Sequence, residues 1–199
     1  MIPPVCDDVR RKVEVYYAAR GQSVAHRMDH IQRVRAHAEV IVGHFPGADC
    51  ELLTLAVLLH DVMSPFDRKE RHVRLSMNTA RRILNGVRYP PARTECVLAI
   101  IAEHSTEEPR EGPLSSVEAQ ILFDADKLDG VGANGIARAF ALKGQQGFDP
   151  LIAAEWYRKK IVIALDHMQT GPGKAMMRDR LKFVEDFLNQ MDLENRGIP

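Results

Sequence analysis

Cysteine is scarce in this sequence, which argues against a disulfide-stabilised fold. The chain contains three cysteines, Cys6, Cys50 and Cys96, and no Cys-x-x-Cys pair. We interpret them as reduced thiols and expect a cytoplasmic protein. The first residues lack a basic segment followed by an apolar run, so no secretory signal is expected. No apolar run approaches the ~20 residues that cross a bilayer, so we expect a soluble protein without a membrane partner.

An excess of charge of one sign is also lacking. Lys and Arg together number 27, as do Asp and Glu, so no overall field favours nucleic acid or an anionic membrane surface. Period-two alternation with β-branched residues is nearly absent, which predicts few strands. A length of 199 residues suits one domain. A homodimer is compatible with the sequence, although no exposed apolar patch can be identified from it.

Helical periodicity covers most of the chain. Caps and turn signals predict helices over about 7–20, 23–44, 49–62, 69–84, 91–103, 116–128, 134–142, 150–169 and 173–191. Asp7 or Asp8 is a plausible N-cap of the first helix. Residues 107–113 contain two prolines and a glycine and read as a loop. The pattern predicts an all-α single domain.

His60 and Asp61 end the most apolar segment of the chain, residues 52–59. A helix that is apolar on every side is normally buried, and a carboxylate and an imidazole at its end need a partner. A cation is one such partner, because the C-terminal end of a helix is electronegative and this pair is a common ligand set. The alternative is a capping histidine beside an exposed aspartate.

Further ligands would have to come from segments that are distant in sequence. Four histidines lie at spacings of four and seven on the second predicted helix, so that they share roughly one face: His26, His30, His37 and His44. Acidic residues follow the apolar residues 121–123: Asp124, Asp126 and Asp129. Spacing alone chooses neither between His26 and His30 nor among the acids.

Together these segments resemble the HD-domain phosphohydrolase superfamily, whose signature is a histidine, then an adjacent His-Asp, then a distant aspartate. The matching segments are Asp-His-Ile-Gln-Arg-Val at 29–34, Leu-Leu-His-Asp-Val at 58–62 and Asp-Ala-Asp-Lys-Leu-Asp at 124–129. Residues 101–105, 118–122 and 135–140 further resemble a bacterial-type subfamily of small HD hydrolases. The resemblance implies one HD-domain helical bundle over residues 1–199, with a core at about 20–145 and C-terminal helices at about 150–192 packed on it.

The resemblance implies one divalent metal held by His30, His60, Asp61 and Asp126. His30 is favoured over His26 because it precedes the Arg-Val pair, and Asp126 over Asp124 because it precedes Lys-Leu-Asp. Two imidazoles and two carboxylates suit Mn²⁺ or Mg²⁺, with Fe²⁺, Co²⁺ or Ni²⁺ as substitutes in vitro. Such an ion activates water for in-line attack on phosphorus, so Asp61 is counted as catalytic as well as ligating.

Secondary roles are assigned to six further features. Residues 68–93 are strongly basic, with Glu70 as the one acid, and Arg71 is our candidate there for substrate phosphate binding. His104 and His72 are candidates for phosphate donors or the general acid; we place His104 in catalysis and His72 in substrate binding. Lys127 is expected to neutralise phosphate charge. Asp129 is assigned to substrate binding, with metal-ligand support or a structural cap as alternatives.

Residues 130–135 match G-x-G-x-x-G in letters. The dinucleotide fingerprint requires a preceding strand in a βαβ unit, which the pattern does not provide here. We interpret this segment as a glycine turn that lets two helices approach closely.

The leading hypothesis is a metal-dependent phosphohydrolase acting on a small phosphorylated metabolite, with a nucleotide as the expected substrate. The subfamily resemblance sharpens this to a nucleoside-triphosphate pyrophosphohydrolase. His72 and His104 leave open a mixed-valent di-iron oxygenase or a two-metal phosphodiesterase on the same fold. A non-catalytic nucleotide-binding regulatory module is a third class.

Overall fold

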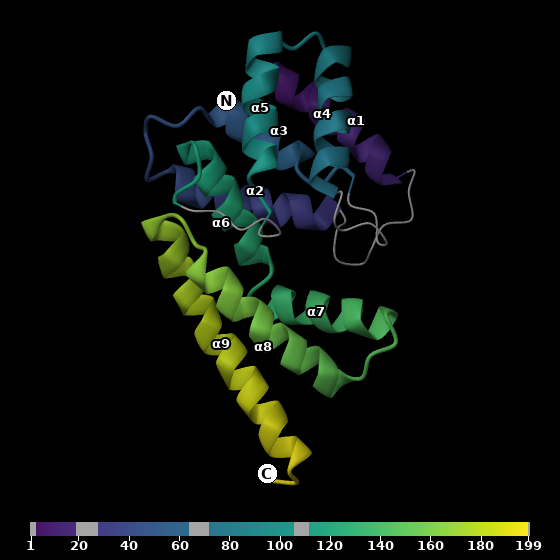
Figure 1. The fold of residues 1–199 in the computed structure, drawn as a ribbon, viewed down its shortest axis with the longest axis vertical. Coiled ribbons are helices and arrows are strands. Elements are labelled where there is room, and N and C mark those ends of the chain that lie inside the picture. The colour runs from purple at the N-terminus through teal and green to yellow at the C-terminus, as the bar shows by residue number, and fades with distance from the viewer. Residues whose placement is uncertain (1–2, 19–27, 64–71, 106–111, 199) are drawn as a thin grey trace.

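The structure is a computed structural model that describes residues 3–18, 28–63, 72–105 and 112–198. These residues form nine α-helices and no strand, which confirms the all-α prediction (Figure 1). The helices are α1 (Pro4–Ala18), α2 (Met28–Val42), α3 (Cys50–Leu59), α4 (His72–Gly86), α5 (Pro91–Ala102), α6 (Val117–Asp129), α7 (Ala133–Gln145), α8 (Pro150–Asp166) and α9 (Gly171–Asn195). None of them combines the length and apolar character that a membrane crossing requires.

Two helix starts differ from the sequence prediction. Helix α1 begins at Pro4, so Asp7 lies within its first turn instead of capping it. Proline suits a first helical position because its missing N–H would have no intrahelical partner there. Helix α9 begins at Gly171 because Thr170 is its N-cap, with Oγ1 accepting from the Gly173 N–H at 2.9 Å. The positions predicted as the beginnings of the second and fourth helices, residues 23 and 69, lie outside the described residues.

Helix α3 lies at the centre of the N-terminal part of the fold. Its six buried side chains are all at most 4% exposed: Leu53, Leu55, Ala56, Val57, Leu58 and Leu59. It packs against α1, α2, α5 and α6, and α2 packs along α6. Because other helices contact α3 on several sides, apolar side chains are buried all around it. This packing brings the C-terminal end of α3 next to α2 and α6.

The C-terminal helices lie on one side of this body, where α7 packs against α8 and α9 contacts α6 and α7 (Figure 1). The buried carboxylate of Asp124 on α6 connects the two parts. It accepts hydrogen bonds from the backbone N–H groups of Gln169 and Thr170 and from the Thr170 hydroxyl. A Cβ on Gly173 would lie 2.2 Å from the Asp124 Oδ2, so only glycine fits there. Asp124 thus anchors the start of α9.

The glycine-rich segment 130–135 comprises the turn between α6 and α7, residues 130–132, and the first residues of α7. Gly132 has a φ of +92°, a conformation that favours glycine. A Cβ on Gly135 would lie 2.3 Å from the carbonyl oxygen of Gly130. The preceding element is a helix, so the segment is the close helix–helix turn that the sequence predicts.

Candidate metal centre

His60 and Asp61 follow the last residue of α3. His60 is the C-cap residue of the helix, since its backbone N–H donates to the Ala56 carbonyl, and its side chain is fully buried. Its Nδ1 lies 2.9 Å from the Val57 carbonyl oxygen, which can only accept. The proton is therefore assigned to Nδ1, and the lone pair of Nε2 points into the site. Burial lowers the pKa of His60 to about 4, outweighing the neighbouring carboxylates, so the ring is neutral as a metal ligand must be.

His30 from α2 and Asp126 from α6 meet this pair. The His30 Nε2 lies 3.5 Å from the Asp126 Oδ1 and 3.8 Å from the Asp61 Oδ2. The His60 Nε2 lies 3.9 Å from each of the same two oxygens. Burial acts to raise the pKa of Asp126, but the Lys127 ammonium and the two imidazoles hold that pKa well below its usual range. His30, His60 and Asp126 therefore form a group that could hold a metal ion, and the Asp61 Oδ2 lies within 3.9 Å of both imidazole nitrogens.

These distances fit a shared ion. Two atoms that each lie about 2.1 Å from one ion are at most about 4.2 Å apart. The four distances above, 3.5 to 3.9 Å, are within that limit. The buried His60 Nε2 also has no hydrogen-bond partner among the described residues, and a bound cation would be a partner for its lone pair. Three of the four residues predicted as ligands, His30, His60 and Asp126, thus form a group that could hold one divalent metal, and the Asp61 Oδ2 lies beside both imidazoles.

Asp129 lies behind His30. Asp129 is 1% exposed. Its carboxylate accepts hydrogen bonds from the His30 Nδ1 at 2.7 Å and from the Arg33 Nε at 2.5 Å, and it forms an ion pair with Arg138. Burial acts to raise the pKa of Asp129, but these donors lower it well below its usual range. An ionised carboxylate at Nδ1 keeps the proton there and leaves Nε2 of His30 available to a metal. Asp129 is not among the residues that line the cavity described below, and its contacts are those of a support for a metal ligand.

A second group of potential ligands adjoins the first. The other oxygen of Asp61, Oδ1, lies 3.5 Å from the His104 Nε2 and 4.0 Å from the His72 Nε2. His104 is 2% exposed, and its Nδ1 lies 2.6 Å from the Ile101 carbonyl oxygen, which repeats the arrangement of His60 at the end of α5. Asp61, His72 and His104 together form a cluster that could hold a metal ion. The two oxygens of Asp61 therefore face two different groups of imidazoles.

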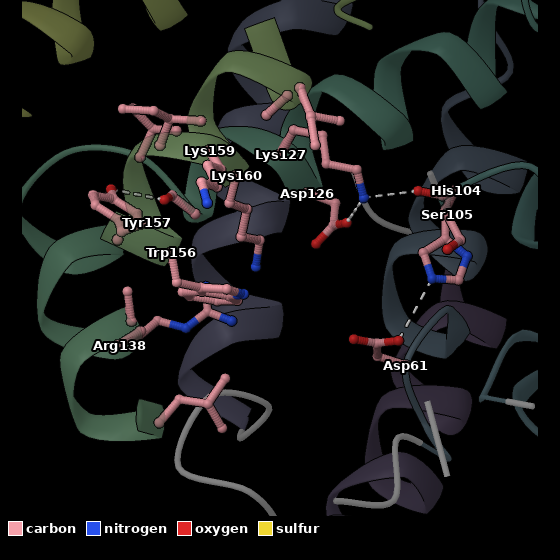
Figure 2. A pocket seen from close by; sticks show the side chains of 18 of the residues that line it. Asp61, His104, Ser105, Asp126, Lys127, Arg138, Trp156, Tyr157, Lys159 and Lys160 are labelled. Carbon is pink, nitrogen blue, oxygen red and sulfur yellow. Dashed lines mark hydrogen bonds and ion pairs between the residues drawn. The ribbon is translucent and has the colours of Figure 1, made fainter. Parts of the chain in front are cut away.

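These side chains open into a cavity of about 510 Å³. One wall of the cavity is formed by Asp61, His72, His104, Asp126 and Lys127. Figure 2 labels four of them, all except His72. The Lys127 Nζ lies 2.6 Å from the Asp126 Oδ2 and donates to the His104 carbonyl at 3.0 Å. The ammonium is thereby held beside the metal ligands, at the edge of a space large enough for a small metabolite.

Other sequence candidates have different surroundings. His26 and Arg71 lie outside the described residues. His37 contacts the Ala125 carbonyl and Arg180, and His44 is exposed. The described arginines of the basic segment do not line the cavity: Arg74, Arg81, Arg82, Arg88 and Arg93. Three of them have other partners: Arg81 pairs with Glu95, Arg93 pairs with Asp49 and Glu51, and Arg82 donates to the Thr79 hydroxyl.

Sequence reasoning assigned no role to the opposite wall of the cavity. That wall comes from α7 and α8 and includes Arg138, Trp156, Lys159 and Lys160. Arg138 lies in the 135–140 segment, which carried part of the family resemblance, so a signal was present for this residue. Trp156, Lys159 and Lys160 belong to no motif, and only the packing of α8 on α7 brings them to the site.

Known proteins resemble this chain over almost its whole length. The Bacillus subtilis protein YpgQ is 29% identical over 185 residues, covering 89% of this chain and 88% of YpgQ. A structure from Lactobacillus plantarum superposes with a TM-score of 0.79 at 25% identity, over 99% of this chain and 100% of the other. A Bacillus thuringiensis HD-superfamily hydrolase gives a TM-score of 0.73 at 26% identity, over 96% of each chain. YpgQ in complex with ADP gives 0.73 at 27%, over 98% of this chain and 100% of the other.

The family model described as the HD domain matches residues 27–130 of the 199. That range is more than half of the chain, and it holds His30, His60, Asp61 and Asp126. Because this family model covers more than half of the sequence, the chain belongs to the HD domain family.

Proposed function

We propose that this protein is a metal-dependent phosphohydrolase that acts on a nucleotide, and specifically that it releases pyrophosphate from nucleoside triphosphates. The observation that carries the proposal is that His30, His60 and Asp126 form a group that could hold a metal ion, with the Asp61 Oδ2 beside both imidazoles, and that Asp61 and Asp126 line a 510 Å³ cavity. YpgQ, which has a similar fold, is known in complex with ADP, and this supports a nucleotide as ligand. The mixed imidazole and carboxylate ligands favour Mn²⁺ or Mg²⁺.

When bound, such an ion supplies Lewis acidity toward a phosphoryl oxygen and lowers the pKa of a water nucleophile. The residues of the chain do the rest. Asp129 fixes the ring of His30, and the Val57 carbonyl fixes the ring of His60, so the ligand nitrogens need little reorganisation. Lys127 places a positive charge beside the cavity, where it can neutralise a phosphate oxygen.

His104 is positioned to act on the substrate from the same wall. Its Nδ1 is engaged by the Ile101 carbonyl, and its Nε2 is directed toward Asp61. A protonated His104 could give its Nε2 proton to a leaving oxygen, whereas a neutral one can only accept there. His72, whose side chain is 13% exposed, lines the cavity next to it and is proposed to contact substrate phosphate.

A second candidate function is a two-metal phosphodiesterase. The cluster of Asp61, His72 and His104 favours it, since the Oδ1 of Asp61 faces that cluster while Oδ2 faces His30 and His60. A carboxylate that bridges two ions would present its oxygens in this way. The same cluster would serve a di-iron oxygenase.

The test combines metal content with a substrate panel. Protein as purified, and protein stripped with a chelator and reloaded with Mn²⁺, are analysed for the identity and number of ions per chain. Both are assayed for product release from nucleoside mono-, di- and triphosphates and from a phosphodiester, and the purified protein also for oxygen consumption. One tightly held ion with pyrophosphate release is the expected result. Two ions with phosphodiester cleavage favour the second candidate, and two irons with oxygen-dependent turnover indicate an oxygenase. Nucleotide-induced thermal stabilisation with no turnover would contradict both hydrolase proposals and indicate a binding module.

A further inference from the structure

The wall of the cavity formed by α7 and α8 is cationic. The charged side chains that α7 and α8 contribute to it are Arg138, Lys159 and Lys160. The acids that line the cavity are Asp61 and Asp126, and both belong to the metal ligands. Figure 2 shows Arg138, Trp156 and Lys160 on one side of the cavity and Asp61, Asp126 and His104 on the other. An anion can therefore be met by a metal ion on one side and by fixed positive charges on the other.

Trp156 supports the cations of this wall. The Lys160 Nζ lies 5.0 Å from the centre of the indole ring, and the Lys143 Nζ from α7 lies 4.4 Å from it. Both ammonium groups are within the range of a cation–π interaction. Trp156 and Lys160 are four residues apart on α8, so they share one face of the helix. The indole ring thus contacts ammonium groups from two helices, and of these two lysines Lys160 lines the cavity.

Arg138 connects this wall to the metal ligands. One of its guanidinium nitrogens, Nη1, donates to both the backbone carbonyl and the carboxylate of Asp129, the residue that also holds His30. The guanidinium is therefore fixed in place while it lines the cavity. The absence of a side chain at Gly135 lets the start of α7 lie directly against Gly130, after the end of α6.

We propose that the α7–α8 wall is an anion-binding subsite for the phosphates that lie beyond the scissile one, with Lys160 as its main cationic residue. This inference rests on the proposed function and names the substrate class: esters with two or more phosphates. A single phosphate at the metal ligands leaves most of a 510 Å³ cavity empty. A polyphosphate chain can extend across it from Lys127 to Lys160.

The subsite is tested by binding, with one nucleoside carrying different phosphate chains. Affinities of Mg²⁺-loaded protein for AMP, for the non-hydrolysable analogue α,β-methylene-ATP and for inorganic tripolyphosphate are measured by calorimetry. Lys160→Gln should weaken binding of the analogue and of tripolyphosphate by about tenfold, the value of one charge-assisted contact, and leave AMP nearly unchanged. Lys160→Arg should restore most of that loss, because it retains the charge. Lys182→Gln is the matched control, since this exposed lysine lies on α9 away from the cavity lining.

The outcomes separate this inference from the proposed function. Equal affinities of the Lys160→Gln variant and the wild type for both polyphosphates would overturn the subsite, even if nucleotides are hydrolysed. Equal weakening of AMP and the analogue would also overturn it, because the effect would then not depend on the additional phosphates. Lys160-dependent binding of tripolyphosphate without nucleotide hydrolysis would support the subsite and contradict the proposed function. Absence of any binding to the wild type would overturn both.

Discussion

Substitution of Asp129 by asparagine tests whether this residue supports the metal site. The side chain keeps its size but loses its charge and one acceptor oxygen. In the wild type that carboxylate receives His30, Arg33 and Arg138, and it is 1% exposed. An amide that points its NH₂ group at any of these donors creates a repulsive contact and leaves a cation without its partner.

Two effects can be estimated. Removing one partner of a buried ion pair costs roughly 3–5 kcal/mol, and we expect the lower end because the side chains of Arg33 and Arg138 are 25% and 18% exposed. Loss of a carboxylate that orients a ligating histidine typically lowers metal affinity by about 10- to 100-fold, or roughly 1.4–2.7 kcal/mol. The variant should therefore be less stable without metal and should also bind metal more weakly.

The assays are urea unfolding of the metal-free protein and calorimetric titration with Mn²⁺. Asp179→Asn is the matched control, because Asp179 pairs with an exposed lysine on α9 and its side chain is 78% exposed. The control should change neither quantity by more than a few tenths of a kcal/mol. Wild-type Mn²⁺ affinity in a folded Asp129→Asn protein would refute the assigned role of this residue.

Three further predictions concern the scaffold and the choice of ligands. Gly135→Ala should lower the free energy of unfolding by roughly 1–3 kcal/mol, because the added Cβ would meet the Gly130 carbonyl. Gly144→Ala, on the same helix but with open space around it, should raise the free energy of unfolding by up to about 1 kcal/mol. Urea unfolding of both variants measures the difference. Burial and a nearby arginine lower the pKa of His37 below 6.5, so the unfolded chain binds more protons and stability should fall as the pH drops below that value. His37→Gln should lack this part of the pH dependence in urea unfolding, and an unchanged slope would contradict it. Asp126→Asn should lower Mn²⁺ affinity by about 100-fold or more. Asp124→Asn should leave Mn²⁺ affinity nearly unchanged and lower the free energy of unfolding. Equilibrium dialysis measures the Mn²⁺ affinity of both variants.

The sequence predicted the helices and the ligands for different physical reasons. Helices were visible because periodicity, prolines and caps act locally. The His60–Asp61 pair stood out because charge at the end of an apolar helix requires compensation. The choice of Asp126 over Asp124 came from motif context and stays a prediction. In the structure Asp124 accepts three hydrogen bonds at the start of α9, whereas Asp126 lies beside His30 and His60.

Features that depend on packing between distant segments were not predictable. An acid such as Asp129, three residues after a proposed ligand, suits either substrate or ligand contact, and only the position of α2 beside α6 brings it to His30. The basic residues after the dyad suggested phosphate binding by charge alone. The described arginines of that segment do not line the cavity, while Arg138 and Lys160 reach it through the close approach of α7 at Gly135 and the packing of α8 on α7.

Metal binding and nucleotide hydrolysis by Asp61→Ala, measured beside the wild type, test the central claim most directly. Both proteins are stripped with a chelator, reloaded with Mn²⁺, analysed for bound metal and assayed for product release, with circular dichroism to follow the helical fold. The account predicts that the wild type binds metal and hydrolyses nucleotide, and that the variant loses both while its helical spectrum is retained. Full activity of the variant in the presence of metal would contradict the account.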